Sequence, residues 1–416
     1  MSHKILHITE PTPVPPYEKR ANIPDIRKAG LDPDFWYPLA RSQDVKMGKA
    51  KAVSFAGEPI ALVRSKEAGI FAVEDRCAHR QVPLSVGVVE DGGIRCGYHG
   101  WKFDCTGSCT SVPYLDKCTL HPNSIKAYPC KERYGLIFVF TGDPALADKV
   151  PFPEMPAAEN PKYKVRTLDR RIGCHYSFMH ENLMDMNHQF LHRKLMGSIK
   201  TLFLGKREGP NWVEVDYSFY RKGGKQSLGE KVMINRSGEA KEIKDDDAKK
   251  EAEEKGIKTR DIMTIRTEYP YQTLRFWTAG SSEPALDLWN LYFPVDREQR
   301  INQTYGLMCI QRPGIPWLLD IMWPAIVWFT NGIFNEDKWI CELEQAAFDE
   351  QGEDWNHEIF PAIRSVRRVI TDCGVPIQTS WKGSKSAPKH VRDRTESESP
   401  AEMVQEEPAE VEIETT

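Results

Sequence analysis

The chain has few cysteines for its length and little that resembles an export signal. Ten cysteines in 416 residues fall far below the density of small secreted domains held together by disulfides. The first twenty residues, MSHKILHITEPTPVPPYEKR, contain no apolar core of the kind that a secretory signal requires. We therefore expect a cytoplasmic protein whose cysteines are metal ligands or small buried side chains.

The sequence also lacks the motifs of nucleic-acid-binding proteins, of dinucleotide-binding reductases and of plant-type ferredoxins. No Lys/Arg stripe is interleaved with aromatic residues, which argues against a nucleic-acid partner. The formal net charge is −4, and residues 395–416 alone hold eight glutamates and no basic residue. No glycine-rich dinucleotide fingerprint follows a strand, and no C-x4-C-x2-C spacing occurs. If this chain uses electrons, a separate protein has to deliver them.

One long apolar segment lies at residues 314–334, GIPWLLDIMWPAIVWFTNGIF. It is about long enough to cross a bilayer, but Asp320 and two prolines interrupt it. We expect a buried or pocket-lining element, with a surface that touches a membrane or an apolar partner as the alternative.

The patterning divides the chain into two domains with polar extensions. Short runs of β-branched and aromatic residues separated by turns predict an all-β domain at 35–145. Residues 160–375 mix alternating strands with helical stretches, which predicts an α+β domain with an antiparallel sheet and helices packed on it. Residues 1–34 are expected to form an N-terminal arm, 238–261 a charged insertion as a solvated helix or loop, and 384–416 a disordered acidic tail.

Three stretches of the second domain carry helical periodicity. They are residues 171–197, 338–352 and 358–370. The first of them also holds most of the histidines of that domain.

Two short loops of the first domain each contain one cysteine and one histidine. The pattern is Cys77-x-His79 and, after sixteen intervening residues, Cys96-x-x-His99. Structural zinc sites of the Cys2His2 kind usually place the cysteine pair and the histidine pair separately. In a Rieske [2Fe–2S] centre two cysteines hold one iron and two histidines hold the other, so two equivalent loops suit it better. Structural zinc is the alternative.

The segments CAHR and CGYHGWKFDCTG resemble the cluster-binding loops of Rieske-type proteins. Respiratory Rieske proteins carry a further cysteine in each loop, and those positions hold no cysteine here. Cys105 and Cys109 lie beyond the second loop and are expected to be packing residues. The resemblance is therefore to the oxygenase and ferredoxin branch.

A second metal site is indicated by HENLMDMNHQFLH at residues 180–192. His188 and His192 are four residues apart, so on a helix they share one face. Two imidazoles and one carboxylate make the facial triad of non-heme Fe(II) oxygenases, which leaves positions open for O₂ and substrate.

This segment resembles the mononuclear-iron motif of the Rieske non-heme iron oxygenases, the aromatic ring-hydroxylating oxygenase α-subunit family. The resemblance covers most of residues 35–370 and implies a helix-grip catalytic domain. It implies that Asp185 is an electron-transfer bridge to the cluster of a neighbouring subunit and that Asn182 lies near the iron. The segment FNEDKWICELEQ is similar to the one that supplies the third ligand, which points to Asp337, with Glu336 as its rival.

The histidine spacing departs from the pattern of many family members, which have four residues between the two ligands. Here three residues separate His188 from His192. His175 and His180 show the four-residue gap but precede Asp185, so we expect them to pack around the site.

The resemblance implies the terminal oxygenase component of a multicomponent system. Such a protein would use O₂ and electrons from a separate NAD(P)H-dependent reductase or ferredoxin, as a homotrimer, to hydroxylate or oxidatively demethylate an aromatic or bulky hydrophobic substrate. Four aromatic residues near the expected third ligand suggest an apolar neighbourhood: Trp317, Trp323, Trp328 and Phe329. The alternatives are a cis-dihydroxylating dioxygenase and a Rieske electron carrier fused to a domain that binds a hydrophobic ligand.

Overall fold

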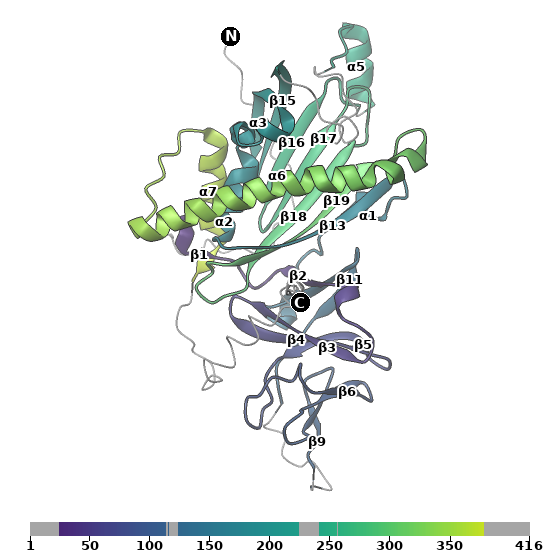
Figure 1. The fold of residues 1–416 in the computed structure, drawn as a ribbon, viewed down its shortest axis with the longest axis vertical. Helices are drawn as coiled ribbons and strands as arrows, with labels where there is room; N and C mark the ends of the chain where they lie inside the picture. The colour runs from purple at the N-terminus through teal and green to yellow at the C-terminus, as the bar shows by residue number, and fades with distance from the viewer. Residues whose placement is uncertain (1–24, 114, 116–123, 224–240, 256, 378–416) are drawn as a thin grey trace, which may run out of the picture.

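The computed structural model describes residues 25–113, 115, 124–223, 241–255 and 257–377. Most of the expected N-terminal arm, residues 238–240 of the charged insertion and the whole acidic tail lie outside these residues. The described chain forms two lobes stacked along the long axis of the molecule (Figure 1). The first lobe is all-β and the second is α+β, so the predicted fold class is confirmed.

The lower lobe in Figure 1 contains three small antiparallel sheets. The first has the order β11 (Cys130–Arg133), β12 (Leu136–Phe140), β2 (Trp36–Arg41). The second has the order β10 (Ala127–Tyr128), β5 (Gly69–Glu74), β4 (Glu58–Ser65), β3 (Lys49–Phe55). The third has the order β6 (Val88–Glu90), β7 (Gly93–Arg95), β8 (Lys102–Asp104), β9 (Cys109–Ser111). The third sheet forms the end of the molecule that is farthest from the second lobe.

The upper lobe is built on one seven-stranded antiparallel sheet. Its order is β13 (Tyr163–Ile172), β19 (Asn302–Gln311), β18 (Leu286–Pro294), β17 (Tyr271–Trp277), β16 (Ile262–Glu268), β15 (Trp212–Gly223), β14 (Ser198–Glu208). The long helix α6 (Pro316–Gln351) crosses the sheet in front, and α7 (Pro361–Cys373) lies beside α2 (Tyr176–Met184) (Figure 1). The charged insertion between β15 and β16 contains the short helix α5 (Asp246–Glu254), one of the two forms expected for it.

The two lobes share one hydrophobic core. Phe55 of β3 stacks on Phe293 of β18 with ring centroids 6.3 Å apart. The Tyr271 hydroxyl donates to the Trp36 carbonyl across the same boundary at 3.0 Å. Burial of large aromatic rings is a strong stabilising contribution, so the lobes are held in a fixed relation. The loops that contain Cys77 and Cys96 follow β5 and β7, so both belong to the lower lobe.

The stretch at 171–197 is not one helix, contrary to its periodicity. It forms α2, the 3-10 helix η5 (Met186–Phe190) and the short helix α3 (Arg193–Met196). Asp185 breaks the first helix with φ −95° and ψ 93°, and its side chain accepts a hydrogen bond from the Asn187 N–H to begin η5. Gly197 ends α3 at φ 73°, a conformation that glycine adopts without strain. Local capping by an aspartate competes here with the helical pattern.

Helix α6 begins 22 residues before the predicted start at 338 and runs through Pro324. This helix contains most of the apolar segment 314–334. The expectation that this segment is buried is wrong for the side of α6 that faces solvent. Trp317, Ile321 and Trp328 are 60%, 64% and 69% exposed, because spacings of four and seven residues put them on one outward stripe. Among the described residues α6 is the single helix long and apolar enough to cross a membrane, and 22% of its apolar window is buried.

Two adjacent aromatic residues of α6 provide a test of this orientation. Phe329 is 1% exposed and belongs to the shared core, whereas Trp328 points to solvent. We expect Phe329→Ala to lower the free energy of unfolding by about 3–5 kcal/mol, and Trp328→Ala to change it by less than about 0.5 kcal/mol. Denaturant unfolding of both variants, followed by circular dichroism, measures the difference. Equal losses would mean that α6 is rotated about its axis.

Candidate metal centres

The two loops of the lower lobe are built alike although their histidines sit at different positions. The Cys77 N–H donates to the Val82 carbonyl and the Cys96 N–H donates to the Trp101 carbonyl, five residues on in each case. The fifth residue of each loop has a positive φ, 61° at Gln81 and 73° at Gly100. At Gly100 the close approach of Pro113 leaves no room for a Cβ. The backbone therefore presents two equivalent turns.

These turns bring the four candidate cluster ligands together. The Cys77 and Cys96 thiols contact each other and are 1% and 3% exposed. Burial, together with the nearby Cys96 thiol, raises the pKa of Cys77 to about 11, although the backbone N–H groups of His79 and Arg80 act in the opposite direction. The imidazoles of His79 and His99 lie outside them, with ring centroids 4.5 Å apart. Paired sulfurs inside and paired imidazoles outside suit a [2Fe–2S] group with one iron nearer the surface.

Each of the two histidines is held by an aromatic neighbour. The Trp101 ring stacks on His79 at 4.9 Å with an interplanar angle of 4°. The Tyr98 ring covers His99 at 3.7 Å and is itself 59% exposed. The outer edge of this centre is therefore a small aromatic surface that opens to solvent.

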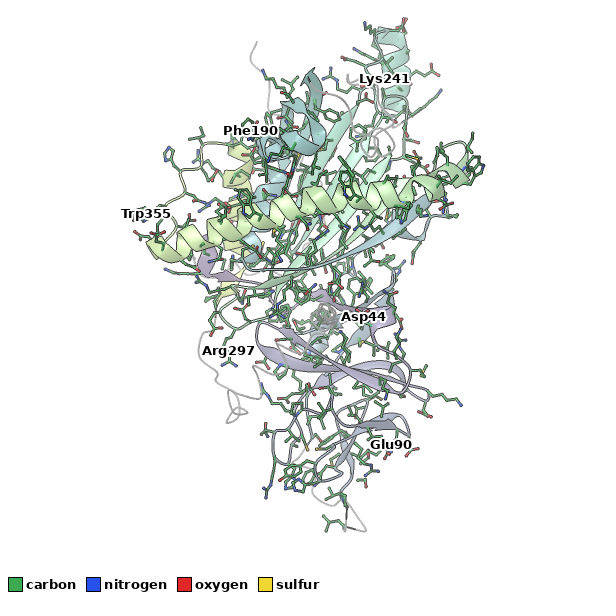
Figure 2. All side chains as sticks on the ribbon, viewed as in Figure 1. Asp44, Glu90, Phe190, Lys241, Arg297 and Trp355 are labelled. Carbon is green, nitrogen blue, oxygen red and sulfur yellow. The ribbon has the colours of Figure 1, made fainter. Side chains whose placement is uncertain are left out.

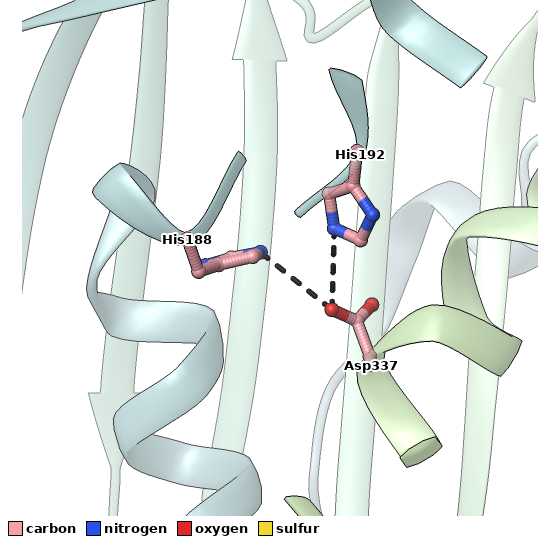
Figure 3. Close-up of side chains that lie close together, drawn as sticks. All are labelled: His188, His192 and Asp337. Atoms are coloured by element: carbon pink, nitrogen blue, oxygen red, sulfur yellow. Dashed lines mark ion pairs between the residues drawn. The ribbon is translucent and has the colours of Figure 1, made fainter. Parts of the chain in front are cut away.

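The second centre lies in the upper lobe and combines residues from three elements. His188 comes from η5, His192 caps α3, and Asp337 comes from the middle of α6. One ligand atom from each residue lies within 4.8 Å of the others. Asp337 Oδ1 is 3.7 Å from His188 Nε2 and 3.2 Å from His192 Nε2 (Figure 3). The structure thus brings together the three residues that the sequence nominated.

The other ring nitrogen of each histidine faces a hydrogen-bond acceptor, which favours a hydrogen on Nδ1. His188 Nδ1 is 2.6 Å from the Asp185 carbonyl oxygen, which only accepts, so Nδ1 carries the hydrogen. His192 Nδ1 is 2.8 Å from Glu336 Oε2, also an acceptor. In the neutral rings, both Nε2 atoms then present lone pairs toward Asp337.

Two lone pairs and a carboxylate oxygen repel one another unless a cation lies between them. His192 Nε2 is buried without a hydrogen-bond partner of adequate geometry, and an orphaned buried acceptor of this kind is costly. Without a metal, a proton on a histidine can take the place of that cation. Burial alone would raise the pKa of the Asp337 carboxyl, but contact with His192 and His188 as imidazolium, and with Asn182, outweighs it and holds that pKa below its usual value. Despite the burial of His192, the two carboxylates in turn raise the pKa of its imidazole. The donor set therefore fits a divalent ion such as Fe(II).

Two residues support Asp337 and His192 from behind. Asn182 Nδ2 donates to Asp337 Oδ1 at 3.0 Å, which places Asn182 where the family resemblance put it. Glu336, the rival third ligand, reaches the far nitrogen of His192 and not the centre of the site. That contact was not predicted, although the helix phase of α6 separates the directions of Asp337 and Glu336.

Asp185 was expected to bridge the two kinds of metal centre, and within one chain its carboxylate does not contact a histidine of either. It meets His188 through its backbone carbonyl, whereas its carboxylate accepts hydrogen bonds from the backbone and side chain of Asn187. The side chain is thus a cap of η5, and no contact between that carboxylate and an imidazole occurs in the described part of the chain.

His175 and His180 do not join the metal-binding group. They are 3% and 1% exposed, and burial lowers the pKa of both, that of His180 to about 3. The His180 ring makes edge contacts with Tyr176 and Tyr292. Both histidines pack behind the site, as expected.

An arginine from the expected N-terminal arm was missed by sequence reasoning. Arg27 inserts under α2, where Nη1 lies 2.5 Å from Glu181 Oε2, and its guanidinium lies 3.5 Å over the Phe178 ring. Arg367 of α7 donates to the other oxygen of Glu181 at 2.6 Å. Glu181 adjoins Asn182, so this buried network fixes the helix that leads into the second centre.

The two centres lie far apart within one chain. Glu90, on the outermost sheet of the lower lobe, and Phe190, at the end of η5 in the upper lobe, lie well apart (Figure 2).

Comparison with known proteins agrees with this architecture. Residues 35–129 match the Rieske [2Fe-2S] domain, and residues 172–370 match the vanillate O-demethylase oxygenase C-terminal domain. The 4β-methylsterol monooxygenase of Methylococcus capsulatus is 31% identical over 380 residues, which cover 88% of this chain and 95% of that protein. A vanillate O-demethylase oxygenase subunit from a Pseudomonas species is 39% identical over 141 residues, 34% of this chain and 42% of that subunit.

Solved structures share the fold at lower identity. Dicamba monooxygenase bound to dicamba superposes with a TM-score of 0.60 and 20% identity, covering 84% of this chain and 96% of that one. The NdmA protein of Pseudomonas putida, solved as a mutant with caffeine, gives a TM-score of 0.57 at 19% identity, with 81% and 88% covered.

The fold and the two centres define an oxygenase subunit with one iron–sulfur domain and one catalytic domain. The chain belongs to the Rieske non-heme iron oxygenases, in which it is a terminal oxygenase subunit with a [2Fe–2S] cluster and a mononuclear non-heme iron. Its relatives are components of multicomponent systems, so a separate reductase or ferredoxin completes the electron supply.

Proposed function

We propose that this chain is a homotrimeric monooxygenase that oxidises a methyl-bearing, bulky apolar small molecule. His188, His192 and Asp337 would hold the mononuclear iron, and Cys77, His79, Cys96 and His99 would hold the cluster. The observation that carries the proposal is that one ligand atom each of His188, His192 and Asp337 lies within 4.8 Å of the others, while each Nδ1 faces an acceptor that favours Nε2 as the metal-binding atom. Iron in such a site supplies O₂ activation, with electrons delivered through the cluster.

The residues of the chain have separate tasks around that point. Asn182 orients the Asp337 carboxylate by donating to Oδ1. The Asp185 carbonyl holds the proton of His188 on Nδ1. Three protein ligands on one side leave the opposite side for substrate and O₂. The overall balance is R–H + O₂ + two electrons + two protons giving R–OH + water.

The separation of the two centres supports a head-to-tail ring of three copies. Arg80 is exposed beside His79 at the tip of the lower lobe. On the upper lobe, the half-buried side chains of Asp185 and Glu358 carry the opposite charge, which suits docking of one copy on the next. Asp185 would then link the imidazoles of two subunits.

The substrate class is inferred from the relatives. One relative that aligns along nearly its whole length is a 4β-methylsterol monooxygenase, and two others are O-demethylases of vanillate and dicamba. We infer that this chain also attacks a methyl group, with loss of the methyl following hydroxylation where the methyl is bonded to oxygen.

A single-turnover experiment tests this function without the natural reductase. The holoenzyme is reduced anaerobically with dithionite, mixed with a 4β-methylsterol or with vanillate, and exposed to ¹⁸O₂. One labelled oxygen atom in the hydroxymethyl sterol, or formaldehyde released from vanillate, is the expected result. Two labelled atoms in a cis-diol would establish the dioxygenase alternative. No product from either probe, in protein with its full iron content, would overturn the substrate class.

A further inference from the structure

Two consecutive carboxylates of α6 face the two ring nitrogens of one histidine. Asp337 Oδ1 is 3.2 Å from His192 Nε2, and Glu336 Oε2 is 2.8 Å from His192 Nδ1. The imidazole is 3% exposed and the Glu336 side chain is 27% exposed. Both ring nitrogens of His192 therefore contact carboxylates from the same turn of α6.

The two histidines of the site are held by acceptors of different charge. His188 donates to a neutral backbone carbonyl at 2.6 Å, whereas His192 donates to a carboxylate. A charged acceptor makes a stronger hydrogen bond and pushes electron density onto the ring. Hydrogen bonds of this kind fix the tautomer of a metal-binding imidazole and raise its basicity as a ligand.

We propose that Glu336 is a positioning residue that fixes the tautomer and orientation of His192 and so strengthens the binding of the mononuclear metal. The inference rests on the proposed metal ligands of the function above. Asp185 and Glu336 contact the two histidines in different ways. Asp185 contacts His188 through its backbone carbonyl, which a side-chain substitution leaves in place. Glu336 contacts His192 through its carboxylate, which a substitution removes.

The position of His192 in the chain explains why its ring needs the hydrogen bond to Glu336. It lies between η5 and α3, with φ −83° and ψ 9°, and its side chain makes no capping bond. Neither η5 nor α3 therefore fixes the His192 ring through a capping hydrogen bond. Without Glu336, Nδ1 would lose its acceptor, and the proton could move to Nε2, the atom that faces Asp337. The metal would then have to displace that proton.

Metal affinity in the absence of turnover tests this role. Protein that retains its cluster but lacks the mononuclear metal is titrated anaerobically with Fe(II) against a coloured chelator. We expect Glu336→Ala to raise the dissociation constant roughly 10- to 100-fold, and Glu336→Gln, whose amide oxygen still accepts a hydrogen bond, to raise it less. Glu350→Ala removes an exposed glutamate from the same helix and should leave affinity unchanged. The visible spectrum of the cluster shows that each variant is folded.

A spectroscopic signature distinguishes positioning from a general loss of structure. With Co(II) in the site, proton NMR should show two strongly shifted, solvent-exchangeable imidazole N–H signals, one for each histidine. Glu336→Ala should lose or broaden one of them by faster exchange, while Glu350→Ala keeps both. If Glu336→Ala keeps both signals and the wild-type affinity, Glu336 has no positioning role. If the wild type itself binds no Fe(II) beyond its cluster, the proposed ligands are wrong, which is a separate failure.

Discussion

His188→Ala and Asp337→Ala will each remove one iron per chain and leave both acid-labile sulfides in place. The wild type should contain three irons and two sulfides, the sum of a [2Fe–2S] cluster and one mononuclear site. Each variant deletes one of three ligands at a centre where Asp337 is 7% exposed and His188 is partly buried. Loss of the metal should reduce turnover to background. Iron and sulfide assays on anaerobically purified protein measure both quantities.

The matched variant at the other centre should give the opposite pattern. Cys77→Ala should remove both sulfides and two irons while one iron stays, because the two centres occupy different lobes. Cys105→Ala, at an exposed cysteine outside the loops, is the control and should change neither count. If His188→Ala retains three irons, the mononuclear ligands are assigned wrongly. If Cys105→Ala loses sulfide, the assignment of the loops is wrong.

The first centre was predictable because its chemistry is local. Each loop contains its cysteine and histidine within four residues, so the spacing alone nominates the ligands. The sequence does not show that the loops are equivalent, since the histidines stand at the third and fourth positions. That equivalence comes from the backbone, where the hydrogen bonds from Cys77 and Cys96 close both turns in the same way.

The second centre was predictable in its residues but not in its backbone. Four-residue spacing predicted one helical face for His188 and His192, yet the chain forms η5 and α3 because Asp185 ends α2 and caps the next turn. Periodicity detects which residues share a direction over a few positions. It does not report a side-chain cap that competes with the helix.

The choice between Asp337 and Glu336 was contained in the phase of α6. Three buried residues of α6 share a helical face with Asp337. Ile326 lies eleven residues before it, Thr330 lies seven residues before it, and Cys341 lies four residues after it. These spacings share one helical face, so Asp337 points inward and Glu336 is turned away by about 100°. The same phase puts Trp317 and Trp328 on the outside. The sequence prediction weighed their apolar character without locating the helix start, and the expected burial of 314–334 is wrong for the outer face for that reason.

Asp185→Asn should slow electron delivery while leaving both metal centres loaded. Asparagine keeps a side-chain oxygen that can accept from the Asn187 N–H, so η5 stays capped, and the backbone carbonyl still holds His188. The variant removes only the charge that the proposed trimer uses to link imidazoles across subunits. We expect the single-turnover rate to fall roughly 10- to 100-fold, the range for loss of an outer hydrogen-bond partner of a metal site. Stopped-flow oxidation of the pre-reduced cluster, with substrate and O₂ present, measures that rate.

The control for this prediction is Asp247→Asn on α5, an exposed carboxylate in the charged insertion. It changes the net charge by the same amount and should leave the rate unaltered. A wild-type rate in Asp185→Asn would show that the carboxylate takes no part in transfer between subunits. A loss of iron in that variant would show instead that Asp185 acts through His188. A slow rate with three irons and two sulfides retained would support Asp185 as the coupling residue of the proposed trimer, because its carboxylate contacts no imidazole within the described part of one chain.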